Sequence, residues 1–428
     1  MIAWSETELA IQQAVRQFVD TEIRPVREEL EFGELPPYDI LRKLFKTFGI
    51  DVLASDALQA MLAKEAGRDA GDTDGSGEST GGSGGMLGAS GQHGMAMLLV
   101  KEIARASLGT VAAMGVSLGL GVATIMSRGT LAQKQRWLPK LVTMEHVAAW
   151  ALTEPGSGSD AFGAMRTTAR RDGEGYRLNG QKTFITNGPY ADVVVVYAKL
   201  DDPGTPPDKR QILTFVLDTG MAGFTQGKPL RKMGLHSSPT GELFFDDVYL
   251  EPDRLLGHAA DGSGGESPAA EGAVGAGGKD SAKAGFVSER VGVAVMSLGV
   301  IEECLELCVR YAKERVQFGR PIGEYQLIQA KLAEMEIARI NVQGMVFRAI
   351  EMLRKGQLPT LAEASAMKLY SSRTATDVAM EAIQLFGGNG YMAEYPLEQM
   401  ARDAKSLMIY AGSNEIQTTH IAKGLLQD

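Results

Sequence analysis

The sequence has little of the residue chemistry that metal and disulfide sites need. Its 428 residues include two cysteines and five histidines. Cys304 and Cys308 stand four residues apart, which places them on one face of a helix rather than in a Cys-x-x-Cys motif. The histidines show no His-x-x-x-His spacing. The pattern therefore predicts two reduced helix cysteines and no metal site.

Excess positive charge and long apolar runs are also lacking. Lysine and arginine total 43 against 53 acidic residues, a formal net charge of -10, whereas nucleic-acid binding needs a basic face. No run approaches the ~20 consecutive apolar residues that span a bilayer, because the run from Val291 ends at Glu302. The first residues lack the basic and apolar regions of a targeting segment. We therefore expect a cytoplasmic protein that binds neither nucleic acid nor membrane.

What the sequence does show is a change of hydrophobic period along the chain. Residues 5–48, 95–126 and 131–142 have apolar positions at helical spacing. Residues 176–200 and 211–250 contain short β-branched and aromatic runs, with expected turns at Asn179-Gly180, Asn187-Gly188 and Pro203-Gly204. After about residue 286 the helical period returns. This order predicts an α+β fold.

The domain boundaries follow from this order. We expect an N-terminal helical domain over 1–147, a central β domain over 148–257 and a C-terminal helical domain over 286–428. Residues 67–94 and 258–285 are dominated by small and acidic residues, too poor in apolar side chains to offset the entropy of ordering. They are predicted to be flexible insertions. An alternative is that they cover an active-site entrance, because each precedes a helix assigned to the site.

Five motifs carry the functional prediction. The first is a polar, glycine-rich loop, a kind that offers backbone N–H groups and hydroxyls to a ligand. The motifs are, in order, Trp150-Ala-Leu-Thr-Glu-Pro-Gly-Ser-Gly-Ser-Asp160, Gly180-Gln-Lys-Thr-Phe-Ile-Thr-Asn-Gly188, Lys232-Met-Gly-Leu-His-Ser-Ser-Pro-Thr240, Arg315-Val-Gln-Phe-Gly-Arg-Pro-Ile322 and Gln384-Leu-Phe-Gly-Gly-Asn-Gly-Tyr391. Together they resemble the acyl-CoA dehydrogenase family over essentially the whole chain apart from the two insertions.

The resemblance implies the family's fold, activity and partners. The expected fold has an N-terminal helical domain, a central β-barrel-like domain and a C-terminal four-helix bundle around FAD. The family usually forms a homotetramer built as a pair of dimers. Its reaction is the α,β-desaturation of an acyl-CoA to the trans-2-enoyl-CoA, as in fatty acid β-oxidation. Electron-transfer flavoprotein is the electron acceptor that the resemblance implies.

Motif matching also assigns the contact residues. Those expected at the flavin are Trp150, Leu152, Thr153, Ser159, Phe184, Ile185 and Thr186, and Ser413 and Glu415 are also expected to bind the cofactor. The family usually has Trp where this chain has Phe184, and the Thr186 hydroxyl is expected to face the flavin N5. Those expected at the FAD pyrophosphate and adenosine, partly across a dimer interface, are Arg315, Phe318, Gln326, Gln384, Gly387 and Gly388. For Arg315 the alternative is an ion pair with a carboxylate such as Glu314. Residues expected at the substrate are Ser159, Arg290, Tyr410, Ala411 and Gly412.

The catalytic base departs from the common family pattern. Many members carry the base as Glu in a Tyr-Glu-Gly-Thr segment, but here that position is Ala411 in Ile409-Tyr-Ala-Gly-Ser-Asn-Glu-Ile-Gln417. A branch that includes isovaleryl- and long-chain-type enzymes has instead a Glu-Arg pair on an earlier helix. Ser288-Glu-Arg-Val-Gly292 resembles that pair, so Glu289 is the predicted base. Alternatives are an acid that only stabilises a helix start, and Glu415 as the base.

The resemblance also implies how the thioester is activated. The backbone N–H of Ala411 and a flavin ribityl hydroxyl would polarise its carbonyl. Burial of Glu289 would raise its pKa toward the working pH of a general base. A flavin oxidase on the same fold and a base-deficient structural subunit remain alternatives. The small residues Gly115, Ser117, Gly119 and Gly121 indicate either a deep acyl cavity or close helix packing.

Overall fold

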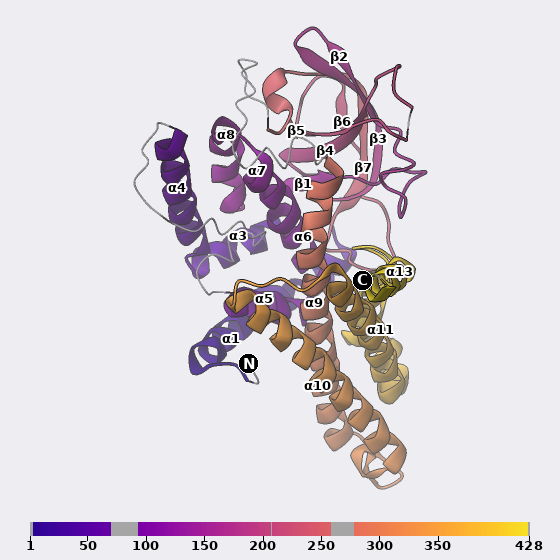
Figure 1. The fold of residues 1–428 in the computed structure, drawn as a ribbon. Helices are drawn as coiled ribbons and strands as arrows, with labels where there is room; N and C mark the ends of the chain where they lie inside the picture. The colour runs from indigo at the N-terminus through magenta and orange to yellow at the C-terminus, as the bar shows by residue number, and fades with distance from the viewer. Residues whose placement is uncertain (1–2, 70–92, 207, 258–277, 427–428) are drawn as a thin grey trace.

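The chain builds a helical region at each end and a β-sheet between them (Figure 1). The computed structural model describes residues 3–69, 93–206, 208–257 and 278–426. Most of the two predicted insertions, residues 70–92 and 258–277, therefore lies outside the described residues. The order helix, sheet, helix agrees with the α+β prediction.

The N-terminal region consists of short helices. The first begins at a capping box in which the Ser5 side chain accepts from the Glu8 backbone N–H. The helices are α1 (Glu6–Phe18), α2 (Arg27–Phe32), α3 (Tyr38–Thr47), α4 (Ile50–Asp69), α5 (His93–Ala104), α6 (Leu108–Gly115), α7 (Ala123–Arg128) and α8 (Leu131–Val142). A π-helix, η1 (Val19–Ile23), and a 3₁₀-helix, η2 (Arg24–Val26), join α1 to α2, and a second π-helix, η4 (Val116–Val122), joins α6 to α7.

The run Leu108–Arg128 differs from the sequence prediction about apolar segments. It is long and apolar enough to cross a membrane by length and composition, with a mean hydropathy of 1.8 in its best window. Glycine, serine and threonine interrupt the run, so it contains no long unbroken apolar stretch. Most of that window, 61%, is buried inside the protein. Val111 and Ile125 belong to hydrophobic clusters, as expected of a core helix.

The central domain is a seven-stranded sheet with the order β1-β4-β2-β3-β7-β6, in which β5 also pairs with β4. Its β4 is buried on both faces, because Val195 and Tyr197 contact one hydrophobic cluster and Val194 and Val196 contact another. The strands are β1 (Ala148–Ala151), β2 (Thr168–Asp172), β3 (Gly175–Thr186), β4 (Val193–Leu200), β5 (Ile212–Asp218), β6 (Phe224–Gln226) and β7 (Thr240–Leu250).

One predicted turn in this domain is wrong. Asn179-Gly180 lies inside β3, at a register shift against β7, rather than between two strands. Gly180 has a φ of 146°, and a Cβ there would lie 2.6 Å from the Thr167 Oγ1. The glycine is therefore used for a β-bulge and a close approach, which local sequence does not distinguish from a turn.

The C-terminal region is helical, and α9 begins earlier than the sequence predicted. Its first residue is Gly278, and α4 likewise extends to Asp69, so both reach into segments predicted as insertions. The Gly/Ser/Ala composition was misleading there, because alanine and lysine are good helix formers. The elements are α9 (Gly278–Glu314), β8 (Val316–Gln317), β9 (Arg320–Pro321), α10 (Gln326–Arg354), α11 (Leu361–Phe386), α12 (Leu397–Leu407) and α13 (Asn414–Leu426), with 3₁₀-helices η6 (Ile322–Glu324) and η7 (Gly387–Tyr391).

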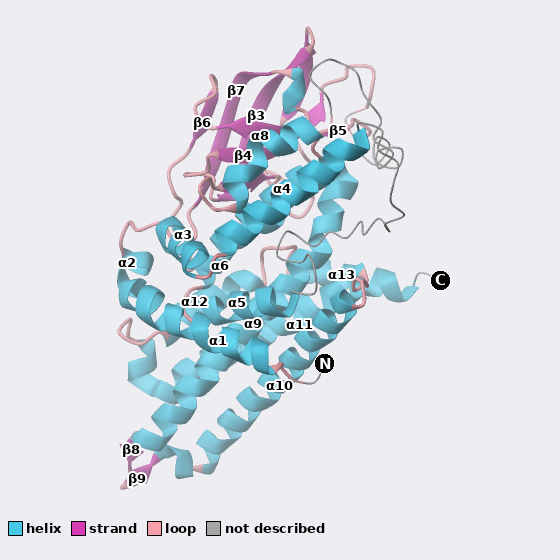
Figure 2. Cartoon of the chain, turned by 90° about the vertical axis from the view of Figure 1, so that its left-hand side faces the viewer, coloured by secondary structure: helices cyan, strands magenta, loops and turns pink. Residues whose placement is uncertain are grey.

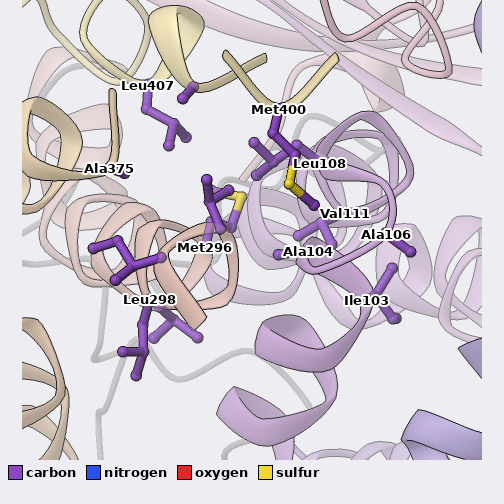
Figure 3. Packing of buried hydrophobic residues seen from close by; sticks show 14 of the residues in the cluster. Ile103, Ala104, Ala106, Leu108, Val111, Met296, Leu298, Ala375, Met400 and Leu407 are labelled. Atoms are coloured by element: carbon purple, nitrogen blue, oxygen red, sulfur yellow. The ribbon is translucent and has the colours of Figure 1, made fainter. Parts of the chain in front are cut away.

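The main core lies where the two helical regions meet. Figure 3 shows Leu108 and Val111 of α6 near Met400 of α12, with Met296 of α9 beside them. The long helix α9 runs from the β domain to the far end of the molecule (Figure 1). Cys304 and Cys308 are free and buried on α9, which confirms the prediction for both cysteines.

A buried network of charges fixes α9 against the N-terminal region. The Lys101 Nζ lies 2.7 Å from the Glu302 Oε2, and the Arg105 Nε donates to the Glu303 Oε2 at 2.9 Å. The network joins α1, η2, α5 and α9 through Arg16, Arg24, Lys101, Glu102, Arg105, Glu302, Glu303 and Glu306. Each buried member has at least two partners of opposite charge, so the network as a whole, rather than one ion pair, joins the two regions.

Candidate active site

Glu289 lies on α9, eleven residues after the helix begins at Gly278. The residue as a whole is partly exposed. Loss of hydration raises the pKa of Glu289 to about 7, and the positive charges of Arg290 and Lys368 act in the opposite direction. A carboxyl with a pKa near neutral pH suits a general base.

Arg290, the neighbour of Glu289, points into the protein. Its side chain is 2% exposed, and its Nη1 donates to the Ser365 Oγ at 3.0 Å. The guanidinium lies over the ring of Phe286, 5.6 Å from the ring centroid. Burial lowers the pKa of Arg290, although the Glu289 charge opposes this. Arg290 is therefore a buried cation beside the predicted base.

Side chains of α11 and α13 donate hydrogen bonds to the carbonyl groups of the turn between α12 and α13. The Gln417 Nε2 donates to the Ala411 carbonyl at 2.9 Å and to the Gly412 carbonyl at 2.7 Å. The Lys368 Nζ donates to the Gly412 carbonyl at 2.8 Å. Ala411 and Gly412 have positive φ angles of 56° and 80°. Among the residues that the structure describes, no acceptor receives the amide N–H groups of Ala411, Gly412 or Ser413. The turn therefore presents backbone donors to a ligand.

Tyr410 connects this turn to α9. Its hydroxyl lies 3.7 Å from the Met296 Sδ. Burial raises the pKa of Tyr410, and the charges of Glu289 and Asp403 raise it further. Near Gly412, a Cβ built on the glycine would lie 3.8 Å from the Arg290 Nη2. The structure thus brings together Glu289, Arg290, Tyr410, Ala411 and Gly412 from two distant segments.

Glu415 lies in a different environment from Glu289. It is exposed in the first turn of α13. Hydrogen bonds from the backbone N–H at this helix start and from Ser413 lower the pKa of Glu415. A stabilised carboxylate is a weaker proton acceptor than one whose pKa is raised. Chemically, Glu289 is the better candidate base.

The glycine-rich loop after β1 is anchored to the sheet by a buried ion pair. The Lys182 Nζ donates to the Leu152 carbonyl at 3.0 Å and to the Glu154 Oε1 at 2.8 Å. Glu154 also accepts from the Thr167 backbone N–H at 3.0 Å. At Gly156 and Gly158 an added Cβ would meet nothing within 4 Å, and Ser159 is exposed. The outer face of the loop is therefore open to a ligand.

The end of β3 supplies the other predicted flavin contacts. Phe184 has a φ of 58° and is 69% exposed, whereas Ile185 is buried. Thr186 is partly exposed. The indole N–H of Trp150 is directed into the protein, because it donates to the Tyr197 hydroxyl at 3.2 Å. Non-glycine residues in a left-handed backbone conformation cluster at functional sites, and the exposed Phe184 ring is available to a ligand.

The predicted pyrophosphate and adenosine residues lie at the other end of the C-terminal helices. Figure 2 shows the β8–β9 hairpin at the end of the molecule opposite the β-sheet. The Tyr311 ring stacks on Phe386, with 3.9 Å between ring centroids, and so brings the end of α11 to the end of α9. Arg315 makes no ion pair with any described carboxylate, so the alternative pairing with Glu314 is not observed. Exposed in this group are Arg315, Phe318, Gln326, Gln384, Gly387 and Gly388.

Comparison with known proteins gives the family. Three family models match: the acyl-CoA dehydrogenase N-terminal domain over residues 77–145, the middle domain over 149–248 and the C-terminal domain over 276–426. An acyl-CoA dehydrogenase of Bacillus subtilis (strain 168) is 35% identical over 426 residues, which are 99% of this chain and 98% of that protein. The chain belongs to the acyl-CoA dehydrogenase family.

Two solved structures agree with this membership. The butyryl-CoA dehydrogenase of Megasphaera elsdenii is 31% identical, with a TM-score of 0.80 over the whole of both chains. A chain in the structure described as the electron transferring flavoprotein of Acidaminococcus fermentans is also 31% identical over both whole chains, with a TM-score of 0.79. The predicted three-part fold and the predicted enzyme class, a flavin-dependent acyl-CoA dehydrogenase, are confirmed.

The residues present fit the FAD of this family. The loop over residues 156–159 has space above its glycines, the Phe184 ring is exposed, and the turn at Ala411 has free amide donors. Backbone donors and an aromatic face are what a flavin with its hydroxylated side chain requires. The match between these residues and FAD therefore rests on their chemistry as well as on the sequence motifs.

Sequence reasoning missed four supporting residues. They are Glu154, Lys182, Lys368 and Gln417, all buried and all bonded to a loop of the site. Two of them had a signal in the sequence, because Lys182 lies at a buried position of a strand and Lys368 at a buried position of a helix. A lysine is seldom fully buried unless it has partners. The sequence alone does not identify those partners.

Proposed function

We propose that this acyl-CoA dehydrogenase uses Glu289 to remove the α-proton of an acyl-CoA thioester and forms the trans-2-enoyl-CoA, with FAD as its cofactor. The observation that carries the proposal is the position of Glu289: its neighbour Arg290 lies near Gly412 of the Ala411 turn, and the charge of Glu289 acts on Tyr410. The Glu289 pKa of about 7 supports the same role. Ala411 itself has no proton acceptor. This assignment places the chain in the branch with the base on the earlier helix.

The residues of the site would share the work as follows. The free amide of Ala411 donates to the thioester carbonyl and stabilises the negative charge that develops there. The α C–H bond then breaks, its proton passes to the Glu289 carboxylate, and its electron pair enters the forming double bond. FAD, when bound, supplies the acceptor for the hydride that leaves the β-carbon. Residues of the 153–159 loop, with Phe184 and Thr186, would hold it.

The second part of the proposal is a homotetramer in which Arg315 and its neighbours complete the cofactor site of another copy. Within one chain these residues lie at the end opposite the β-sheet (Figure 2). The same end exposes large apolar side chains: Phe318 is 96% exposed, Leu327 81% and Tyr391 77%. Exposed apolar groups of this kind mark an interface between proteins.

The proposed electron acceptor is an electron-transfer flavoprotein. The support is the 31% identical chain in the structure described by that name. Oxygen is the alternative acceptor. Reducing the purified holoenzyme with light under anaerobic conditions and then admitting air distinguishes the two, because an oxidase reoxidises within seconds and a dehydrogenase reoxidises slowly. A colourless protein purified alone would instead favour the structural-subunit alternative.

The test of the base is Glu289→Gln. This change keeps the shape of the side chain and removes the proton acceptor. We expect acyl-CoA still to bind and flavin reduction to slow by about 10²–10⁴-fold. The measurement is flavin bleaching in a stopped-flow instrument under anaerobic conditions.

A second variant and a control sharpen the test. In Glu289→Gln combined with Ala411→Glu, a carboxylate returns at the turn and should recover part of the rate. Ala411 already has a φ of 56°, so a glutamate at this position adds no new kind of backbone strain. Glu415→Gln is the control and should change the rate far less. An unchanged reduction rate in Glu289→Gln, with FAD and substrate bound, would remove Glu289 from the mechanism.

A further inference from the structure

Lys368 is a buried cation, and no carboxylate among the described residues forms an ion pair with it. It lies on α11 and is 0% exposed. Its Nζ donates to the Gly412 carbonyl at 2.8 Å and to the Asn414 Oδ1 at 3.0 Å, and both acceptors are neutral. A buried charge costs stability, and an apolar side chain of similar volume often replaces such a charge without loss. The position therefore calls for a function that an apolar residue would not serve.

We propose that Lys368 is a positioning residue for the reaction, which holds the Ala411–Gly412 turn by its carbonyl side and keeps a positive charge beside Glu289. The inference rests on the proposed role of Glu289 and extends it. It gives Lys368 two separable effects, one on the backbone donors of the turn and one on the base.

The first effect is on the turn. Lys368 and Gln417 both donate to the Gly412 carbonyl, and Gln417 also donates to the Ala411 carbonyl. Asn414 is fixed in turn by the Ser372 hydroxyl, which donates to its Oδ1 at 3.2 Å. Because the carbonyl groups of Ala411 and Gly412 are bonded to these side chains, the amide N–H groups of Ala411 to Ser413 remain free to donate to the thioester. A displaced donor of this kind stabilises the developing charge less well.

The second effect is on Glu289. The groups that act on it are Arg290 of its own helix and Lys368 of α11. The two helices meet here, because the Arg290 Nη1 donates to the Ser365 Oγ, one turn before Lys368 on α11. Glu289 in turn raises the pKa of Tyr410.

Burial lowers the pKa of Lys368 to about 8, and Glu289 and Glu415 act in the opposite direction, so Lys368 is charged over the pH range in which Glu289 titrates. Arg290 also acts on His420 of α13. Burial raises the pKa of Glu289 while Arg290 and Lys368 lower it. Without Lys368 one opposing charge is lost, so Glu289 would keep its proton to a higher pH.

The sign of the kinetic effect follows. A general base must be unprotonated, so the flavin reduction rate rises with pH and levels off above the pKa of the base. Loss of an opposite charge nearby shifts that pKa upward by about one unit or more. The midpoint of the wild-type rise is expected near 7, and Lys368→Met should move it upward by about one unit. Compared with the wild type, the flavin reduction rate of Lys368→Met should therefore be lowered about tenfold more at pH 6 than at pH 9.

The experiment compares four variants of the FAD-loaded enzyme between pH 5.5 and 9.5. The probe is whichever of butyryl-CoA, isovaleryl-CoA and octanoyl-CoA reduces the wild type fastest. Lys368→Met should show the raised midpoint, and Lys368→Arg, which keeps the charge, should restore it. Gln417→Met should lower the plateau about tenfold and leave the midpoint in place. Lys423→Met, which removes a charge from an exposed position of α13, should change neither.

A substrate analogue provides a readout that is independent of electron transfer. A 3-thia-acyl-CoA has sulfur in place of the β-carbon, so its α-proton can leave but no hydride can follow. Its deprotonated form beside the oxidised flavin gives a charge-transfer absorption band. The pH midpoint of that band should rise in Lys368→Met and return in Lys368→Arg.

The outcomes separate the inference from the proposed function. If Glu289→Gln is slow but Lys368→Met has the wild-type midpoint, the inference is overturned and the role of Glu289 stands. If Glu289→Gln reduces its flavin at the wild-type rate, the proposed function itself fails. If Lys368→Met yields no folded holoenzyme, Gln417→Met and Lys368→Arg decide. A wild-type plateau in Gln417→Met, or a raised midpoint in Lys368→Arg, then counts against the inference.

Discussion

Two glycines of the π-helix η4 should respond in opposite ways to the same substitution. At Gly121 an added Cβ would lie 2.5 Å from the Ala148 Cβ of β1, and Ala148 is 0% exposed. At Gly119 an added Cβ would meet nothing within 4 Å. Neither glycine has a positive φ, so alanine is allowed at both. Thus Gly121 serves close packing, while Gly119 and Gly115 face open space.

The magnitudes follow from these distances. Replacing a helical glycine by alanine favours folding by about 0.5–1 kcal/mol. We expect that gain in Gly119→Ala. In Gly121→Ala the contact forces β1 or η4 to move, and overpacking costs about 1–3 kcal/mol. The two variants should therefore differ by about 1–3 kcal/mol in the free energy of unfolding.

The assay is urea unfolding of the FAD-loaded enzyme at one fixed protein concentration, because cofactor and association both change apparent stability. Gly115→Ala is the matched control and should behave as Gly119→Ala does. Because β1 leads into the flavin loop, Gly121→Ala should also retain less FAD. If Gly121→Ala proves as stable as Gly119→Ala, the close packing of η4 on β1 is wrong.

Two further predictions concern other parts of the chain. Burial and the Asp403 charge raise the pKa of Glu31 to about 7, above its unfolded value, so its contribution to stability is present below about pH 4.5 and is lost as pH rises through 7. The urea unfolding midpoint of Glu31→Gln should therefore rise relative to that of the wild type as pH increases from 5.5 to 8.5. A difference between the two midpoints that does not change with pH would refute this. Arg315→Ala should weaken FAD retention more than folding, because a guanidinium forms forked contacts with phosphate. Gel filtration with flavin absorbance checks it, and a stable monomer with full flavin would contradict the proposed assembly.

The sequence predicted the site best where a local motif carries the chemistry. The prediction that Glu289 replaces the base missing at Ala411 needed only two short segments, and the structure brings both segments together. The role of Glu289 itself stays a prediction. The fold class also followed from local patterns, since the change of hydrophobic period marks the helical and β regions.

What the sequence did not predict depends on contacts between distant residues. Lys182 bonds a carbonyl 30 residues away, and Lys368 bonds one 44 residues away. Those partners exist only once the sheet and the helices have packed. The bulge at Gly180 has the same origin, because its need for glycine comes from Thr167 on a neighbouring segment. Composition also failed at Gly278, where alanine and lysine favour a helix within a glycine-rich stretch.

The charge network between α5 and α9 has a consequence for how this enzyme tolerates mutation. Glu302 and Glu303 lie about four turns along α9 from Glu289, a distance of about 20 Å along the helix axis. A base on α9 is aligned by the contacts that stop this helix from sliding or rotating, and these come from the N-terminal region as well as from α10 and α11. Arg105 and Lys101 supply that stop from the N-terminal region. Substitutions in this network, far from the substrate, are therefore expected to lower the turnover rate as well as the stability of the fold.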